Sequence, residues 1–429
     1  MGDFAYYSDM KQTKEQWLGK IPSSWHALRL KSMFNIKKDI AGKEGLTVLS
    51  VTQKGIRPKD MTDKGQFAQD YSHYQLVNRG EFVMNHMDLL TGWVDISDYD
   101  GVTSPDYRVF INSNSKKYDS KYYRYIFQLC YSARIFYGLG QGVAGFGRWR
   151  LPADMFLNFV LPVPSLKEQQ AISAYLDDQT SQIDSIIEEA KSSIEEYKRW
   201  RTSVIFDCVT KGLNSGTEMK SCSIDAINEI PVHWNTGSIK SVATCNDDVL
   251  QESTDPEYEF EYVDIGSVKY GEGILHTERM YFKDSPSRAR RLVKKNDILI
   301  STVRTYLKAV ALIDCEDNHL IASTGFAVLR ARRIDPKFLY YAVLSDRFIS
   351  TVESYSTGMS YPAINATKLI SFKIPIPPAD EQIMISKYLD STCENIKGII
   401  AEKEALIADL ETYKHSLIYE AVTGKRKVV

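Results

Sequence analysis

The segment Leu161-Pro-Val-Pro-Ser-Leu-Lys-Glu-Gln-Gln170 decides the fold, because the chain repeats it as Ile374-Pro-Ile-Pro-Pro-Ala-Asp-Glu-Gln-Ile383. The match runs without a gap over residues 161–210 and 374–423 at a constant offset of 213, and 18 of its 50 positions are identical. An internal repeat of this length indicates two copies of one unit, related by a pseudo-twofold axis or by translation. A pseudo-twofold protein would suit a bipartite partner.

Each copy predicts a long helix. The prolines favour an extended entry, and Ser165 with Glu168 forms a capping box at the helix start. Roughly 45 residues would make a rod of about 67 Å, ending near Gly212 or Gly424. Two rows with a seven-residue period follow the cap in each copy: Leu176, Ile183, Ala190, Tyr197, Val204 with Ile172, Gln179, Ile186, Ser193, Trp200, and Leu389, Ile396, Lys403, Leu410, Leu417 with Ile385, Thr392, Ile399, Leu406, Tyr413. These rows predict that the two helices pair as a coiled coil, parallel or antiparallel; ordinary long core helices are the alternative.

The regions between the helices also repeat, with more divergence. Ile21-Pro-Ser-Ser-Trp25 matches Ile230-Pro-Val-His-Trp234, and residues 80–84, 103–107 and 122–126 match 296–300, 322–326 and 338–342. Strands are expected at 46–51, 81–84, 107–111, 262–265, 298–302 and 326–329, and helices at 122–131 and 336–345. The predicted fold class is therefore α+β: two α/β globules separated by two long helices, with an internal pseudo-twofold repeat. The expected domains are residues 1–163, 164–215, 216–376 and 377–429.

Composition places the chain among soluble globular proteins. Its 429 residues are 43% hydrophobic and 25% charged, a size that suits two to four domains. No 18-residue apolar stretch occurs and the N-terminus is polar, so neither a membrane span nor a signal peptide is expected. The six cysteines are scattered without a CxxC pair, which argues against zinc and favours a reducing cytoplasm.

Charge is unevenly distributed although the net charge is only −2. Residues 279–308 carry nine Lys or Arg against two acids, and residues 167–196 carry eight acids against two lysines. The first stretch predicts a local basic face that could meet phosphates, or else a solvated surface run. Phosphate-loop, HExxH, GxSxG and adenine-methylase tetrapeptide motifs are missing from the sequence, which therefore predicts no catalytic residue and no metal site.

These segments together resemble a known family, the specificity subunits of type I restriction–modification systems. The resemblance covers nearly the whole chain and is carried by the two Ile-Pro-x-x-Trp segments at 21–25 and 230–234, the repeated proline–Glu-Gln starts at 161–169 and 374–382, and the stretches 80–85, 296–304 and 322–326. One departure is the stretch 145–151, Gly-Phe-Gly-Arg-Trp-Arg-Leu, which differs from the more family-like 357–365.

The resemblance implies DNA sequence recognition. Residues 1–163 and 216–376 would be target recognition domains, each reading one half of a bipartite gapped duplex DNA site. The helical segments 164–215 and 377–429 would space them and dock two DNA adenine methyltransferase subunits, which restriction subunits then join. No cofactor is expected on this chain, because S-adenosylmethionine, ATP and Mg²⁺ would bind the partner subunits. No membrane partner is expected, and the location would be the cytoplasm.

The residues expected to touch DNA are basic, amide and aromatic side chains on loops. Arg and Lys pair with guanine edges or phosphates, and Gln pairs with adenine. The candidates are Gln53, Lys54, Arg57 and Lys59, with Arg148 and Arg150 as secondary choices, in the first globule, and Lys269, Tyr270, Arg304, Tyr306, Lys308 and Tyr361 in the second. Other readings are the specificity part of a type IIB-like restriction system, a coiled-coil bridging protein that binds no DNA, and an independent enzyme.

Overall fold

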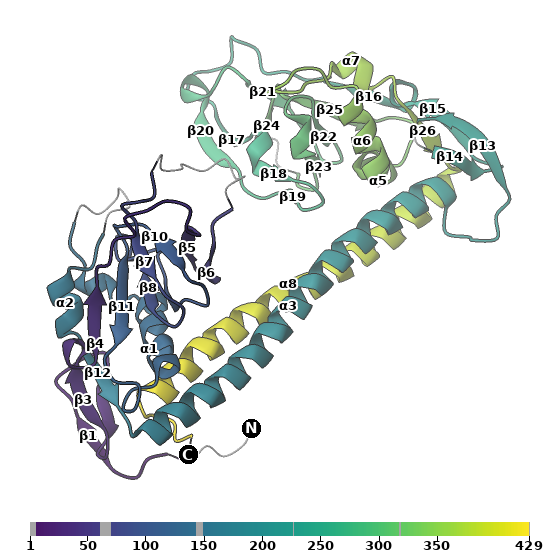
Figure 1. Cartoon of the computed structure of the whole chain (residues 1–429). Coiled ribbons are helices and arrows are strands. Elements are labelled where there is room, and N and C mark those ends of the chain that lie inside the picture. Colours follow the sequence, from purple (N-terminus) through teal and green to yellow (C-terminus); the bar gives the residue numbers. More distant parts are fainter. Residues whose placement is uncertain (1–5, 61–69, 143–148, 226, 317–318, 429) are drawn as a thin grey trace. The chain divides into compact units, whose positions relative to one another are not determined.

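The computed structural model describes residues 6–60, 70–142, 149–225, 227–316 and 319–428. It divides into two compact units: residues 1–190 with 404–429, and residues 191–403. Both divisions fall inside the two long helices, α3 (Leu166–Lys211) and α8 (Ala379–Val422) (Figure 1). Each helix therefore contributes one part to each unit.

The first unit is built on a small antiparallel sheet in the order β4-β11-β8-β9. Two-stranded sheets β1-β2, β12-β3, β10-β7 and β5-β6 surround it. Its elements besides the long helices are β1 (Met10–Gln12), β2 (Lys20–Pro22), β3 (His26–Arg29), η1 (Leu30–Ser32), β4 (Phe34–Lys37), β5 (Leu49–Thr52), β6 (Gly55–Pro58), β7 (Gln75–Val77), β8 (Phe82–Met84), β9 (Val94–Ile96), β10 (Gly101–Thr103), β11 (Arg108–Asn112), α1 (Ser120–Ser132), η2 (Tyr137–Leu139), α2 (Ala153–Asn158) and β12 (Val160–Val163).

The second unit repeats this plan, with a sheet in the order β16-β25-β22-β23. It also contains a second four-stranded sheet, β20-β17-β24-β21, whereas the other sheets of the first unit have two strands each. The elements are β13 (Met219–Ile224), β14 (Ile227–Pro231), β15 (Asn235–Ser238), α4 (Ile239–Val242), β16 (Ala243–Cys245), β17 (Glu259–Val263), η3 (Ile265–Ser267), β18 (Val268–Lys269), β19 (Gly273–Ile274), β20 (Glu278–Tyr281), η4 (Phe282–Asp284), β21 (Ala289–Leu292), β22 (Ile298–Ser301), η5 (Thr305–Leu307), β23 (Val310–Leu312), β24 (Leu320–Ser323), β25 (Phe326–Ala331), α5 (Pro336–Leu344), α6 (Asp346–Ser354), α7 (Ala366–Leu369) and β26 (Lys373–Ile376).

The two central sheets match strand by strand and in register. Met84 of β8 pairs with Arg108 of β11, and in the second unit Ile300 of β22 pairs with Ala327 of β25. The strands and helices expected from the sequence are all present, with ends moved by up to three residues. What the sequence did not predict was the strand order, which depends on contacts between distant segments.

The start of each long helix is fixed to its globule by the same contacts. In the first unit, Glu168 accepts hydrogen bonds from the backbone nitrogen of Ser165 (3.1 Å) and from the indole of Trp25 (3.2 Å). In the second, Glu381 accepts one from the indole of Trp234 (2.9 Å). The capping box is confirmed at the first helix, and the repeated Glu also binds the repeated Trp. The repeat therefore preserves a helix–globule joint as well as a helix.

The next repeated residue continues this joint. Gln169 accepts from the backbone nitrogen of Asp119 at 2.7 Å, and Gln382 accepts from that of Asp335 at the same distance. Each Asp caps the helix that follows it, α1 or α5. Both glutamines are buried, so this bond satisfies a polar group that would otherwise be costly.

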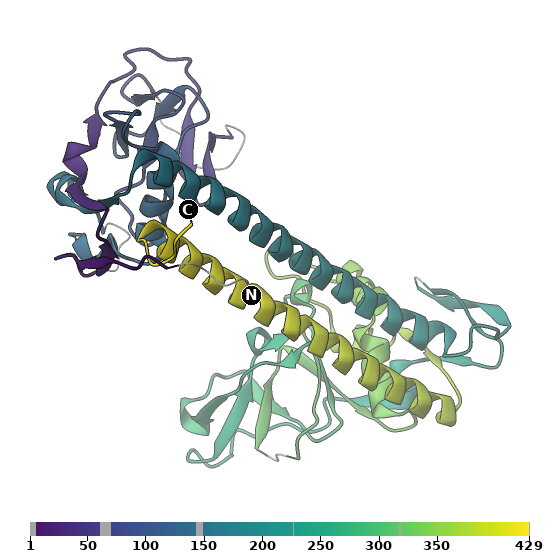
Figure 2. The same cartoon turned by 90° about the horizontal axis from the view of Figure 1, so that it is seen from below.

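The long helices run antiparallel within each unit. In the first unit, Lys414 of α8 binds Asp184 of α3 at 2.6 Å, and Arg426 donates to the Tyr175 hydroxyl at 3.5 Å. In the second unit, the ammonium of Lys403 lies 5.9 Å from the ring centroid of Tyr197. Both views show the start of α3 beside the end of α8 (Figure 1 and Figure 2).

The first expected row is buried over part of its length, and the second is wrong by one position. Leu176, Ile183 and Ala190 are buried as predicted, but Ile186 and Trp200 are 44% and 48% exposed. The second buried row of α3 is instead Thr180, Ile187 and Ile194. In α8, Leu406 and Tyr413 are likewise exposed, while Ala421 is buried. Of that second row, Ile172 and Ile385 are buried, in the cores of the first and second units.

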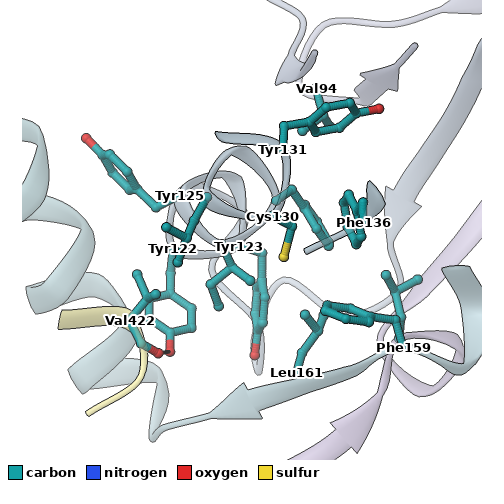
Figure 3. Packing of buried hydrophobic residues seen from close by; sticks show 14 of the residues in the cluster. Val94, Tyr122, Tyr123, Tyr125, Cys130, Tyr131, Phe136, Phe159, Leu161 and Val422 are labelled. Atoms are coloured by element: carbon teal, nitrogen blue, oxygen red, sulfur yellow. Dashed lines mark hydrogen bonds between the residues drawn. The ribbon is translucent and has the colours of Figure 1, made fainter. Parts of the chain in front are cut away.

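An aromatic core joins the first globule to both long helices. Tyr122 and Tyr123 of α1 are fully buried, and the Tyr122 hydroxyl donates to the carbonyl of Val422 at 2.8 Å (Figure 3). Leu176 of α3 and Leu417 of α8 belong to the same cluster. The end of the chain therefore packs on the globule with which the chain begins.

We expect Gly424→Ala to lower the free energy of unfolding by about 1–3 kcal/mol, the usual cost of overpacking. Gly424 has φ +71°, and a Cβ there would meet the Pro22 ring and lie 3.1 Å from the Trp25 indole. Gly398→Ala is the control, because Gly398 lies inside α8 with nothing within 4 Å of its added Cβ. That change should raise stability by about 0.5–1 kcal/mol. Denaturant unfolding of both variants measures the difference. A Gly424→Ala protein whose free energy of unfolding equals that of the natural chain would contradict the packing described.

Candidate nucleic-acid interface

Two loops of the second unit meet at one end of its central sheet. The first follows β22 and includes η5, and the second follows α6. Val303 and Ala363 form a β-bridge between them, and the hydroxyl of Thr305 lies 2.9 Å from that of Ser356. These bonds make the two loops one surface, which we call the paired loops (residues 302–309 and 355–364).

Arg304 lies at the centre of the paired loops. Its φ of 51° is left-handed, which is uncommon for a residue other than glycine and is often found at functional sites. The guanidinium lies 5.1 Å from the ring centroid of Tyr361, which is 65% exposed. Tyr306, 52% exposed, follows two positions later. A cation and exposed aromatic rings on a constrained backbone are suited to phosphates, base edges and stacked bases.

The other candidates of the second unit are less open to a ligand. Lys308 lies 3.8 Å from both Asp346 and Glu353. Lys269 is exposed but pairs with Glu272 at 2.7 Å.

Tyr270 has an internal role in the structure. Its hydroxyl donates to the carbonyl of Leu344 at 3.1 Å, and burial raises its pKa to about 12. Its ring packs against the core of the second unit. The structure therefore groups Arg304, Tyr306, Lys308 and Tyr361 and separates Tyr270 from them.

In the first unit, four candidates lie on or next to the β5–β6 hairpin. Gln53 and Lys54 form its two-residue turn, with Thr52 paired to Gly55, and both are exposed. Arg57 is exposed on β6, and Lys59 just after it is half-buried.

Of the two secondary candidates, the structure describes one. Arg148 lies outside the described residues. Arg150 is exposed and its backbone pairs with Gln141. This bridge is the counterpart of the one between Thr357 and Ala363 in the second unit, so Arg150 belongs to the paired loops of the first unit (residues 85–93, 141–142 and 149–150).

Comparison with known proteins identifies the chain. The family model of the type I restriction modification DNA specificity domain matches it twice, over residues 22–196 and 231–407. The chain belongs to this family. It is a specificity subunit, which recognises DNA sequence and is not the catalytic component.

Relatives match along most of the chain. The type I restriction enzyme MjaVIII specificity subunit of Methanocaldococcus jannaschii is 24% identical over 95% of this chain and 94% of its own. The EcoBI specificity subunit of Escherichia coli is 23% identical over 62% of this chain and 58% of its own. Among solved structures, one from a study of type I R-M complex assembly and conformational transition has a TM-score of 0.68 at 14% identity, covering 94% of this chain and 98% of that one. The HsdS subunit from Thermoanaerobacter tengcongensis has a TM-score of 0.53 at 16% identity, covering 96% and 99%. These two structures support the fold.

The basic stretch of this specificity subunit is not a continuous basic face. Five of its nine cations bind carboxylates, as Arg279–Glu259, Lys283–Glu257, Lys294–Asp248, Lys295–Glu316 and Lys308 with Asp346 and Glu353. Strand pairing accounts for the first two, because β20 lies antiparallel to β17 with Glu259 opposite Tyr281 and Glu261 opposite Arg279. The local charge excess in the sequence is therefore partly cancelled by partners that are distant in sequence.

Sequence reasoning missed one residue within the paired loops of the second unit, Met359, and one close to them, Arg288. Met359, on the same loop as Tyr361, is fully exposed. Arg288 is exposed, and its carbonyl accepts from Thr324 (2.7 Å), while the adjoining carbonyl of Gly325 accepts from Thr302 (2.7 Å). Arg288 lies within the basic stretch, so charge density was a usable signal; for Met359 there was none.

The described part of the chain offers no group of three or more His, Cys, Asp or Glu residues that could hold a metal ion. Nor does it contain a helix that combines the length and apolarity needed to cross a bilayer.

Proposed function

We propose that each unit of this specificity subunit reads one half of a bipartite, gapped duplex DNA site through its paired loops. The observation that carries the proposal is the repeat of one sheet order in both units, with two loops joined by backbone hydrogen bonds at the end of each sheet. In the second unit these loops present Arg304 and Tyr361 to solvent. Two equivalent readers in one chain suit two half-sites. We assign them to the domains 1–163 and 216–376.

We further propose that the helical segments 164–215 and 377–429 form an antiparallel coiled coil that spaces the readers about a pseudo-twofold axis. The buried rows support this, because Leu176 and Leu389, separated by the 213-residue offset, are both fully buried. Buried positions in α3 recur at alternating steps of four and three residues from Leu176 to Ile194, the period of a coiled coil.

Exposed apolar side chains on the long helices are proposed to dock two DNA adenine methyltransferase subunits, which restriction subunits then join. Ile383, Met384 and Tyr388 near the start of α8 are 46%, 57% and 45% exposed. Trp200 and Tyr413 occupy the same repeat position and are both exposed. Aromatic residues and Met are enriched at protein interfaces. On this proposal S-adenosylmethionine, ATP and Mg²⁺ bind the partners, and the complex works in the cytoplasm.

A gel-shift experiment with the methyltransferase partner present tests this function. We expect binding of a duplex that carries the motif found by methylation mapping, and much weaker binding of a duplex with one half scrambled. Absence of any duplex binding would favour a bridging protein instead. Whether the partner system is type I or type IIB-like would follow from the cleavage products of the assembled complex.

We expect Arg304→Ala to weaken binding of the cognate duplex by about 1–3 kcal/mol if Arg304 contacts a base. Because the backbone of Arg304 is in the left-handed region, Arg304→Gly provides a second variant that removes the side chain without backbone strain. Arg333→Ala is the matched control: Arg333 is also exposed, but it follows the opposite end of β25. Fluorescence anisotropy with a labelled duplex measures all three. Unchanged binding and methylation by both Arg304 variants would remove Arg304 from the interface.

A further inference from the structure

The first unit contains a cavity of about 480 Å³ next to its paired loops. Its polar lining residues are Lys38, Gln75, His86, Tyr107, Arg108, Gln141 and Arg150, and none of its lining residues is Asp or Glu. Among the described residues, the lining of this cavity therefore carries positive charge and no acidic side chain.

Arg108 is the most deeply buried of these cations, with 5% of its surface exposed. One guanidinium nitrogen, Nη2, donates to the carbonyl of Leu151 at 3.0 Å, and the group lies 4.8 Å from the Phe156 ring centroid. The other terminal nitrogen, Nη1, is buried and has no hydrogen-bond partner among the described residues. Burial lowers the pKa of Arg108 to about 10. An unpaired buried charge is costly, so the site is short of an anionic partner.

His86 faces the same two cations. Its Nδ1 is buried and has no partner in the described part of the chain. Burial, followed by the charges of Arg108 and then Arg150, lowers the pKa of His86 to about 4. At neutral pH the ring is therefore uncharged and adds no repulsion, and its single N–H can donate either to the backbone of Met84 or to a ligand.

The repeat indicates that the fold itself does not require these side chains. Strand register and the backbone bonds Leu151 N to His86 O (2.9 Å) and Ile364 N to Thr302 O (2.8 Å) align the two units. Under this alignment the counterparts of Arg108, His86 and Arg150 are Ala327, Thr302 and Ala363. The second unit thus builds the same sheet end with small uncharged residues. The charged set of the first unit then needs another reason, and a ligand supplies one.

We propose that this cavity binds a phosphate-type oxyanion through Arg108, Arg150 and His86. Two guanidinium groups can neutralise a phosphate and give it several directed hydrogen bonds. The oxyanion could come from the DNA backbone or from a free phosphate compound. The DNA source rests on the proposed function, because it requires the paired loops of the first unit to lie against the duplex.

Thermal unfolding of the full chain tests the site with inorganic phosphate as the probe. In phosphate-free buffer of matched ionic strength, added phosphate should raise the Tm in a saturable manner, because a ligand of the folded state stabilises it. Arg150→Gln should weaken phosphate binding about tenfold, the loss of one charge-assisted hydrogen bond. Arg134→Gln, at an exposed arginine outside the cavity lining, is the control and should respond to phosphate as the natural chain does.

The variant Arg108→Met shows whether Arg108 binds phosphate or only stabilises the folded chain. The Met side chain keeps apolar packing on Phe156 and removes the buried charge, so this variant should lose the phosphate-dependent rise in Tm without needing phosphate to fold. If Arg108→Met does not fold, Arg150→Gln still decides the matter, since the Arg150 side chain is exposed. No saturable phosphate effect on the natural chain, or an equal effect on Arg150→Gln, would overturn the proposal.

Duplex binding distinguishes the two sources. If both variants weaken phosphate and duplex binding together, the oxyanion is a backbone phosphate of DNA. If phosphate binding is lost while duplex binding is unchanged, the ligand is a free phosphate compound. If phosphate never binds but the duplex does, this inference fails and the proposed function stands. If phosphate binds and no duplex does, the proposed function fails, but the cavity is still an oxyanion-binding site.

Discussion

Replacing residues 216–373 with the equivalent part of a relative should change one half of the methylated motif and leave the other half intact. The exchanged segment contains the paired loops of the second unit, including Arg304 and Tyr361, and none of the first unit. Each base pair that no longer matches should cost about 1–3 kcal/mol. Several such pairs in one half-site would abolish marking of the original motif. This is the largest effect that we expect from any change in the chain.

The exchange succeeds only if the new globule fits the retained helix. The Trp234 indole binds Glu381 at 2.9 Å, and the Tyr341 hydroxyl binds Asp390 at 2.7 Å. The donor must therefore supply Trp and Tyr at these two positions. Methylome sequencing of a host that carries the hybrid and its methyltransferase partner gives the result. A change in both halves together would refute the model of two independent readers.

Inserting one heptad into each long helix should lengthen the gap between the half-sites by about three base pairs. The insertions lie between Ala190 and Ile194 in α3 and between Lys403 and Ile407 in α8. Seven residues preserve the buried rows and add about 10 Å of helix, and one turn of DNA is about 34–36 Å. The bases read at each end should not change, because neither globule is altered.

The antiparallel pairing requires both insertions. The control therefore carries the heptad in α3 alone, which would leave seven residues without matching positions in α8 and should impair assembly. Methylation mapping of the double insertion separates two explanations of the gap. If an assembled, active variant still marks the original spacing, contact between the globules sets the gap and the helices only hold the methyltransferase.

Much of the candidate interface was predictable from sequence, because exposed loops rich in Arg and Tyr stand out between strands. Arg304 and Tyr361 were predicted separately, and the structure places their side chains 5.1 Å apart. Tyr270 has the same composition signal, yet its hydroxyl binds the carbonyl of Leu344, 74 positions away. A single sequence does not reveal such a partner, so it cannot separate a loop aromatic that meets solvent from one that packs inward.

The sequence by itself determined the two long helices, the capping box of the first and the glycines at their ends, because these signals lie within a few residues of one another. Ser165 and Glu168 are three positions apart, and Gly212 directly follows α3. The tertiary structure alone decided that α3 and α8 run antiparallel and which residues form the second buried row of α3. It also decided which cations of the basic stretch are neutralised by carboxylates. Those outcomes depend on partners far along the chain: Lys414 binds Asp184 across 230 positions, and Arg279 binds Glu259 across 20. Arg108 lacks such a partner among the described residues, and only the folded chain shows that its charge is buried.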